Sequence, residues 1–205
     1  MRVGVVSDVH NNVEALTYAL ECMRDCDLVL SLGDLVSDYR VDPRILELAR
    51  ERGLVSIVGN HEKSILLHPG SRIRSTLSDE TLDFLRELPA SREIELDGRR
   101  VHVAHGAPWD DPTDYRCVYV IERDRHALSR VAASTGADVV LLGHTHRAMA
   151  VRVQDTLVVN PGTCGEARDA AQQLTFAKLD GENGDASVFL VQPGQAPEPL
   201  LHADF

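Results

Sequence analysis

The feature that most constrains the fold is an alternation of short apolar segments with helix-like segments over the first 58 residues. The apolar segments are rich in β-branched residues and only about five residues long, which is typical of strands buried on both faces. Between them lie two segments with helical spacing, the second opened by Asp42-Pro43 and closed by Gly53. This alternation predicts parallel strands joined by right-handed helical crossovers, and hence an α/β fold. The predicted strands are Val3–Ser7, Leu28–Leu32 and Leu54–Val58, and the first predicted helix is Val13–Met23.

The rest of the sequence predicts two more helices and three hairpins. One helix is capped by Ser78 and ends before Pro89, and another spans Val118–Ala133. A buried strand is expected at Ala137–Leu142. Turn signals at Asp97-Gly98, at Gln154-Asp155 and at residues 181–184 mark the hairpins. The hairpin strands are Glu93–Leu96 with Arg99–Ala104, Ala148–Val153 with Thr156–Asn160, and Leu174–Leu179 with Ala186–Val191.

No internal repeat or linker divides the sequence, so we expect residues 1–205 to form one domain. Hydrophobic residues make up 43% of the chain and charged residues 26%, which is the composition of a globular rather than a disordered protein. Three prolines, Pro193, Pro197 and Pro199, interrupt the last segment. We therefore expect residues 192–205 to form a loose C-terminal tail.

Charge and hydropathy exclude several classes of partner. Lys and Arg total 21 and Asp and Glu total 32, so the formal net charge is −11 and no diffuse basic surface is available for long nucleic acids or anionic membranes. No apolar run approaches the roughly 20 residues of a membrane-spanning helix, and the first residues leave no room for a signal peptide. The four cysteines form no CxxC pair. We expect a cytoplasmic protein with reduced thiols and no membrane partner.

Polar side chains that bind metals cluster where the predicted strands end. In an open parallel sheet these carboxyl ends lie along one edge, and ligands bind there. Five separate segments are therefore expected to converge on one place. Taken alone, each residue has an ordinary structural explanation, such as a helix cap for Asp8 or a turn for Asn60. The residues concerned are Asp8, His10, Asp34, Asn60, His61, His105, His144 and His146.

Spacing and ligand chemistry predict a centre of two metal ions. Asp8 and His10 are two residues apart, as are His144 and His146, so on an extended backbone each pair points to one side. Imidazole nitrogens and hard oxygens without thiolates suit Mn²⁺, Fe, Zn²⁺ or Co²⁺ better than a structural zinc site. All these residues except His61 are candidate ligands, and seven ligands are too many for one tetrahedral ion. They suit two ions that share a carboxylate.

The same residues resemble the signature of the calcineurin-like metallophosphoesterase superfamily, in which D-x-H, G-D, G-N-H-[DE], H and G-H-x-H follow one another in this order. The resemblance spans residues 8–146, and the turn Asn160-Pro161-Gly162 is similar to one in the small bacterial and archaeal branch. It implies a four-layer α/β/β/α sandwich of two mixed sheets flanked by helices. The motifs stand here as Asp8-Val9-His10, Gly33-Asp34, Gly59-Asn60-His61-Glu62, His105 and Gly143-His144-Thr145-His146.

The resemblance also implies how the ligands divide between the ions, with Asp34 bridging both. Mn²⁺ is the expected metal, and Fe, Zn²⁺, Ni²⁺ and Co²⁺ are alternatives. Many phosphatases of the family have, three residues after the bridging aspartate, an aspartate that orients the catalytic histidine; this chain has Ser37 there, followed by Asp38. Which carboxylate orients His61 is left open by the sequence. The first implied set is Asp8, His10, Asp34 and His146, and the second is Asp34, Asn60, His105 and His144.

The implied activity is hydrolysis of a small phosphodiester or phosphomonoester. Two divalent ions and two carboxylates leave a local surplus of about two positive charges, which attracts a phosphate ester. A hydroxide that bridges the ions is the expected nucleophile, and His61 is the expected general acid. A protein phosphatase and a dinucleoside-polyphosphate hydrolase are alternatives. A non-catalytic scaffold of the same fold, as in the retromer small subunit that resembles this family, is a further alternative, although here the ligand set is complete.

Weaker candidates lie outside these motifs. Arg168 can donate two hydrogen bonds to a phosphate oxygen pair, although an exposed loop arginine is the commoner case. Trp109 either stacks on a base or aryl group at the site or packs in the core. His102 precedes His105 in the strand through Val103 and is expected to be a packed or surface strand residue. No pattern surrounds His68, His126 and His202.

Overall fold

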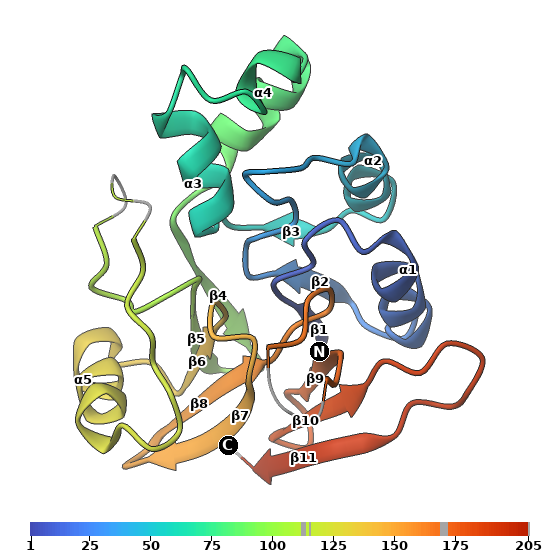
Figure 1. Ribbon diagram of the computed structural model, residues 1–205. Coiled ribbons are helices and arrows are strands. Elements are labelled where there is room, and N and C mark those ends of the chain that lie inside the picture. Colours follow the sequence, from blue (N-terminus) through green and yellow to red (C-terminus); the bar gives the residue numbers. More distant parts are fainter. Residues whose placement is uncertain (112–113, 115, 169–171, 205) are drawn as a thin grey trace.

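Two β-sheets pack face to face, and helices cover the outer face of each (Figure 1). The computed structural model describes the chain except for residues 112–113, 115, 169–171 and 205. The layers run from helices through sheet 1 and sheet 2 to helix again, which is the four-layer α/β/β/α arrangement expected from the sequence.

Both sheets mix parallel and antiparallel strands. Sheet 1 has the strand order β11-β10-β9-β1-β2-β3, and sheet 2 has the order β4-β5-β6-β8-β7. In sheet 1 β1, β2 and β3 are parallel, and in sheet 2 β5, β6 and β8 are parallel. Sheet 1 consists of β1 (Arg2–Val6), β2 (Leu28–Ser31), β3 (Val55–Ser56), β9 (Thr175–Asp180), β10 (Asp185–Leu190) and β11 (Pro199–Asp204). Sheet 2 consists of β4 (Ser91–Leu96), β5 (Arg99–Ala104), β6 (Val139–Leu142), β7 (Ala148–Val153) and β8 (Thr156–Pro161).

The helices are short and capped by side chains at most of their N-termini. Asp42 directly precedes Pro43 and accepts a hydrogen bond from the backbone N–H of Arg44. This cap confirms the predicted start of the second helix. Within the described residues, no helix has both the length and the apolar character that crossing a membrane requires. The helices are α1 (Val13–Cys22), α2 (Pro43–Glu51), α3 (Asn60–Leu67), α4 (Asp79–Glu87) and α5 (Arg125–Thr135), with a short 3₁₀ helix, η1 (Arg74–Thr76).

Strand β6 shows why the short apolar segments lack a polar face. Val139 and Leu141 point into the core between the two sheets, whereas Val140 and Leu142 point into the core under α5. Because side chains alternate along a strand, a strand covered on both sides needs apolar residues at every position. The prediction of strands buried on both faces is therefore confirmed here.

The strand ends that carry the candidate ligands belong to two sheets, so the prediction of a single sheet edge is wrong. β1, β2 and β3 end in sheet 1, whereas β5 and β6 end in sheet 2. The hairpin at Asp97-Gly98 begins the second sheet rather than extending the first. Packing of the sheets nevertheless brings their ends together, because His105 after β5 bonds to the carbonyl of Leu32 after β2, at 2.7 Å.

Two helix predictions need correction. The helix expected over Val118–Ala133 begins only at Arg125, where Asp124 accepts a hydrogen bond from the N–H of Ala127 at 2.9 Å and caps it. Conversely, α3 was not expected, because the polar residues that follow Gly59 resemble a loop. This helix begins at Asn60 and presents only a short apolar face, with Ile65 in the core.

The loose tail expected over residues 192–205 is wrong for its last part. Residues 199–204 form β11, which pairs antiparallel with β10 at the edge of sheet 1. Leu201 and Ala203 pack against the core between the sheets, which stabilises the strand. Pro199 does not prevent pairing, because it is the first residue of an edge strand.

Candidate metal centre

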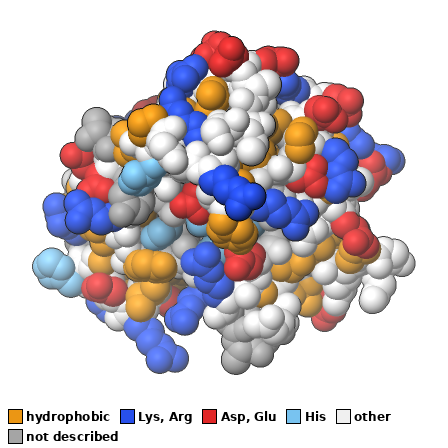
Figure 2. Space-filling view, turned by 45° about the horizontal axis from the view of Figure 1, so that its top comes forward, with side chains coloured by type: hydrophobic (Ala, Val, Ile, Leu, Met, Phe, Trp, Pro, Cys, Tyr) orange, Lys and Arg blue, Asp and Glu red, His pale blue; other side chains and the backbone are white. Residues whose placement is uncertain are grey.

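All eight candidate residues lie together at the ends of β1, β2, β3, β5 and β6. In a space-filling view, histidine side chains lie recessed near the middle of this face, with Lys or Arg side chains near them (Figure 2). Five of the residues have positive φ angles, in the left-handed region that few residues other than glycine adopt. Such backbone persists only where the surrounding structure holds it. The five are Asp8 (51°), His10 (45°), Asp34 (54°), His144 (67°) and His146 (59°).

Two glycines allow these turns to pack against one another. A Cβ at Gly59 would lie 2.1 Å from Asp34 Oδ1, and a Cβ at Gly143 would lie 2.1 Å from Ser7 Oγ. Both distances are far below van der Waals contact, so neither position tolerates a larger residue without displacing the strand ends.

A first group of donor atoms brings together β1, β2 and β6. His146 Nε2 lies 3.2 Å from Asp8 Oδ1 and 3.2 Å from His10 Nε2. His10 Nε2 in turn lies 3.9 Å from Asp34 Oδ2. At a metal–ligand distance of about 2.1 Å, neighbouring ligand atoms of one ion lie about 3 Å apart. The distances between the donor atoms of this group are therefore similar to those between ligand atoms that surround one metal ion.

A second group lies on the other side of Asp34. His105 Nε2 lies 3.4 Å from Asp34 Oδ2 and 3.0 Å from Asn60 Oδ1. His144 Nδ1 lies 2.7 Å from the same Asn60 oxygen. Asp34 Oδ2 is thus the atom common to both groups, while Asp34 Oδ1 accepts a hydrogen bond from the N–H of His61 at 2.9 Å.

Outer hydrogen bonds orient three of the imidazoles. Nδ1 of His105 bonds to the carbonyl of Leu32, Nδ1 of His146 to the carbonyl of Glu166, and Nδ1 of His10 to Ser37 Oγ at 3.1 Å. A carbonyl oxygen only accepts, so Nδ1 of His105 and of His146 carries the hydrogen. Their Nε2 atoms face the centre, and in the neutral imidazole these atoms carry no hydrogen and can bind a metal ion.

The chemistry of the buried donors fits a cation. Asn60 Oδ1 faces His105 Nε2, His144 Nδ1 and Asp34 Oδ2, atoms that all accept hydrogen bonds or ligate metals. The Asn60 amide thus lies among three atoms that can ligate a metal, and its own oxygen can be a further ligand. Asp8 Oδ1 is completely buried and has no hydrogen-bond partner among the described residues. Such a carboxylate oxygen needs a positive partner.

Burial and the carboxylates set the protonation of the site in the absence of ions. Burial lowers the pKa of His10 to about 4, and burial with the nearby His105 lowers the pKa of His144 to about 4. Both are therefore neutral near pH 7, the form that ligates metals. Burial opposes a charge on His105 too, but the Asp34 carboxylate outweighs it and raises the pKa of His105 to about 9. A cation between these two side chains would replace that proton.

Glu62 is a structural residue of the site that the sequence analysis did not single out. Its fully buried carboxylate accepts hydrogen bonds from the backbone N–H groups of Asp34, Val36 and Gly59, at 3.0, 3.1 and 2.9 Å. Burial and the Asp34 carboxylate raise the pKa of Glu62 to about 8, against the effect of these donors. Glu62 thereby joins the loop after β2 to the start of α3.

Asp38 is the carboxylate that contacts His61, which answers the question left open by Ser37. Asp38 Oδ1 lies 2.9 Å from His61 Nδ1, and Asp38 Oδ2 accepts a hydrogen bond from Ser64 Oγ at 2.7 Å. His61 Nε2 lies 3.9 Å from Asp34 Oδ2, so it faces the centre. Ser37 instead contacts His10.

Cys117 was not expected near the site. Its sulfur and one ring nitrogen each of His105 and His144 lie within 4.8 Å of one another. Burial raises the pKa of the Cys117 thiol to about 12, so it is uncharged. No sequence spacing relates Cys117 to the other residues, because it lies in the long loop between β5 and α5.

The weaker candidates lie outside the donor groups. Trp109 packs against the core under sheet 2, with the guanidinium of Arg130 4.0 Å from its ring centroid. Arg168 is exposed and lies 3.9 Å from Glu166. His102 contacts Glu93 on the neighbouring strand, His202 contacts Ser187, His68 caps α3, and His126 is exposed at the start of α5.

Several known proteins are similar to this chain in sequence and in fold. A probable metallophosphoesterase of Methanothermobacter thermautotrophicus is 28% identical over 192 residues, which are 92% of this chain and 91% of that protein. A phosphodiesterase of Methanocaldococcus jannaschii is 25% identical over 80% of this chain and 84% of its own length. The crystal structure of a metallophosphoesterase from Sphaerobacter thermophilus has the same fold, with a TM-score of 0.75 at 21% identity over 94% of this chain and 88% of that one.

The family assignment rests on most of the chain. Residues 1–184 match the sequence profile of the calcineurin-like phosphoesterase superfamily domain. The match includes every candidate ligand and His61. The chain therefore belongs to the calcineurin-like phosphoesterase superfamily and is a phosphoric ester hydrolase.

Proposed function

We propose that the protein hydrolyses a small phosphodiester at a centre of two divalent transition-metal ions, with Mn²⁺ as the preferred metal. The observation that carries this proposal is the position of Asp34 Oδ2, which lies between two groups of buried donors. Asp8, His10 and His146 would hold one ion, and Asn60, His105 and His144 the other, with Asp34 between them. We propose a diester rather than a monoester because a relative from M. jannaschii is named a phosphodiesterase.

Two ions, when bound, supply Lewis acidity that activates water and stabilises charge on the phosphoryl oxygens. The seven ligands would hold that charge in one place in a protein of net charge −11, so an anionic ester would be attracted there and repelled elsewhere. In the reaction, a bond forms between a water oxygen and phosphorus, and the bond to the leaving oxygen breaks. The products are a phosphomonoester and an alcohol.

His61 is the group that we assign to the leaving oxygen. Its ring contacts His10 edge to face, with 4.8 Å between ring centroids, and 15% of its side chain is exposed, so a bound ester can reach Nε2. Asp38 fixes the ring from the opposite side through Nδ1. Nε2 then donates a proton to the leaving oxygen, which departs as a neutral alcohol.

The alternative functions are a non-catalytic scaffold, a protein phosphatase and a dinucleoside-polyphosphate hydrolase. A non-catalytic scaffold does not need a buried, complete donor set or a histidine held by its own carboxylate, and both are present here. Protein phosphatase and dinucleoside-polyphosphate hydrolase activities require different substrates at the same centre. A panel of an aryl diester, an aryl monoester, a phosphopeptide and a dinucleoside polyphosphate, each with Mn²⁺, separates them. Hydrolysis of none of the four would contradict the proposed function.

Replacing His61 with alanine is expected to lower kcat on a phosphodiester by about 10²-fold, as for loss of a general acid. The loss should be smaller for a p-nitrophenyl leaving group than for an alkyl one, since a good leaving group needs little protonation. Metal content, measured by inductively coupled plasma mass spectrometry, should stay unchanged. The matched control is His126→Ala, an exposed histidine on α5. An equal loss for both leaving groups would remove His61 from this role.

Asp38→Ala is expected to lower kcat by about tenfold, because an outer partner that orients a functional histidine typically has this effect. In a protein that already carries His61→Ala, the same change should have no further effect on kcat. This double-mutant cycle separates positioning of His61 from a general structural role. Equal losses with and without His61 would show that Asp38 acts elsewhere.

A further inference from the structure

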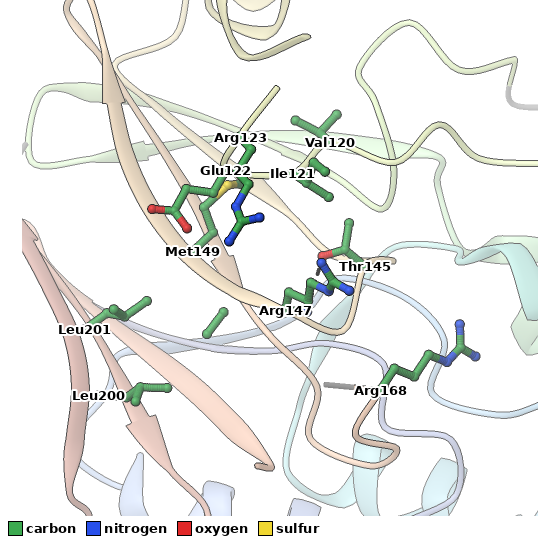
Figure 3. Close-up of a pocket in the computed structure, with 11 residues that line it drawn as sticks. Val120, Ile121, Glu122, Arg123, Thr145, Arg147, Met149, Arg168, Leu200 and Leu201 are labelled. Carbon is green, nitrogen blue, oxygen red and sulfur yellow. Dashed lines mark hydrogen bonds between the residues drawn. The ribbon is translucent and has the colours of Figure 1, made fainter. Parts of the chain in front are cut away.

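A large cleft opens beside the candidate metal centre, with a volume of about 570 Å³ (Figure 3). Volumes of this size are typical of sites for small organic ligands. Its walls come from the loop before α5, from the start of β7 and from the loop after β8, and β11 closes one side. We call it the arginine cleft, after its lining residues Arg123, Arg147 and Arg168.

The arginine cleft leads directly from the donor groups. Thr145, which lines it, lies between His144 and His146 in the sequence and is buried beside them. An adjoining cavity of about 300 Å³ is lined by Tyr119 and shares Thr145 and Arg147 with the cleft. The ring of Tyr119 lies 4.4 Å from that of His144, centroid to centroid. A ligand that extends from the donor groups past Thr145 therefore reaches the cleft.

The charge of the cleft is opposite to that of the protein. Arg123, Arg147 and Arg168 line it, with Glu122 as the one carboxylate among its lining residues, whereas the whole chain carries a net charge of −11. Arg168 lies 3.9 Å from Glu166, an exposed pair that contributes little. No ion pair within the described residues involves the guanidinium of Arg123 or Arg147. These two groups are available to an anionic ligand.

An apolar wall accompanies the arginines. Ile121 and Met149 line the cleft, and Leu201 of β11 lies on the opposite side (Figure 3). Tyr119 at the entrance is 55% exposed and offers a ring face. Apolar and aromatic surfaces next to guanidinium groups match a nucleobase attached to a phosphate, since the base stacks and the phosphate accepts hydrogen bonds.

We propose that the arginine cleft binds a second phosphate together with its nucleoside, so that the substrate is a nucleotide ester with at least two phosphate groups. This inference rests on the proposed function for placing the scissile phosphoryl group at the donor groups. None of the eight candidate residues of the metal centre lines the cleft, so we assign its arginines to an anionic group other than the one that reacts. Arg147 and Arg168 line both the cleft and the adjoining cavity and are the principal contacts.

The first test is binding without hydrolysis. Metal-free protein is titrated with ADP in a calorimeter, and we expect the Arg147→Gln/Arg168→Gln double variant to bind ADP at least about tenfold more weakly, through loss of charge-assisted hydrogen bonds. The matched control is the Arg24→Gln/Arg86→Gln double variant, which removes the same charge from two exposed arginines, one in the turn after α1 and one on α4, each paired with a local carboxylate. Undetectable binding of ADP to the unaltered protein, or equal loss in both variants, would overturn the inference.

The second test compares two substrates that differ in one phosphate. The linear dinucleotide pApA carries a 5′-phosphate besides its diester, and ApA carries the diester alone. We expect kcat/KM with Mn²⁺ to be at least about tenfold higher for pApA, and the Arg147/Arg168 variant to abolish this preference, whereas the Arg24/Arg86 variant should keep it. Hydrolysis of both dinucleotides at equal kcat/KM overturns the inference but leaves the proposed function intact. Hydrolysis of no phosphoester contradicts the proposed function, and the ADP titration still tests the cleft.

Discussion

Asp34→Asn is expected to lower phosphodiester hydrolysis by at least about 10³-fold, equivalent to about 4 kcal/mol of transition-state stabilisation. Asp34 Oδ2 is the atom common to the two donor groups. The asparagine side chain lacks the negative charge of the carboxylate and has a nitrogen in place of one of its oxygens. The amide does retain an oxygen for the N–H of His61, which Asp34 Oδ1 now accepts. Fold and stability should therefore change less than metal binding.

The metal content of Asp34→Asn tests whether its loss of hydrolysis results from loss of metal binding. We expect Asp34→Asn to bind fewer than two equivalents of Mn²⁺ under conditions in which the unaltered protein binds two, as measured by mass spectrometry after gel filtration. The control is Asp83→Asn, because Asp83 is an exposed carboxylate on α4. A variant that retains two ions and near-normal hydrolysis would show that Asp34 does not join them.

Glu62→Ala is expected to reduce the free energy of unfolding by about 3 kcal/mol or more. The change leaves the backbone N–H groups of Asp34, Val36 and Gly59 without the partner that each has now, and every buried unsatisfied donor costs about 1–3 kcal/mol. Glu62→Gln should be intermediate, since its one remaining oxygen still accepts. The measurement is urea denaturation of metal-free protein, which separates stability from metal binding.

An exposed glutamate provides the comparison for Glu62. Glu47 lies on the solvent face of α2, and Glu47→Ala should change the free energy of unfolding by no more than about 0.5 kcal/mol. A loss below about 1 kcal/mol for Glu62→Ala would mean that water or a shifted side chain replaces its hydrogen bonds. Glu62 would then not be the brace between the loop after β2 and α3.

Local rules predicted the elements whose signals are strong over several residues. The strands β1, β2 and β6 are apolar at almost every position, and the turn at Asp97-Gly98 fixes its hairpin. The N-terminal part of α3 and the strand β11 lack such signals. Asn60 and its neighbours at the start of α3 are polar residues of the site, and Pro199 at the start of β11 is a residue that usually interrupts strands. Their structure depends on tertiary contacts, such as Leu201 against the core between the sheets.

The candidate ligands were predictable, whereas the residues that support them were not. The spacing of pairs such as His144 and His146 indicates that both side chains can bind one metal ion. The ends of parallel strands lie at one edge of a sheet, which predicts that such pairs come together. The sequence left open which carboxylate contacts His61, because only the course of the loop after β2 turns Asp38 toward His61 and Ser37 toward His10. Tyr119 and Cys117 reach His144 from a long loop without periodicity, so no local rule places them there.

The most direct test of the two-ion centre is a crystal structure of the protein loaded with Mn²⁺, with anomalous scattering used to locate the metal. We expect two ions about 3.5–4 Å apart. One should contact Asp8, His10 and His146, the other Asn60, His105 and His144, and Asp34 should contact both. A single ion, or two ions of which Asp34 contacts at most one, would contradict the centre proposed here.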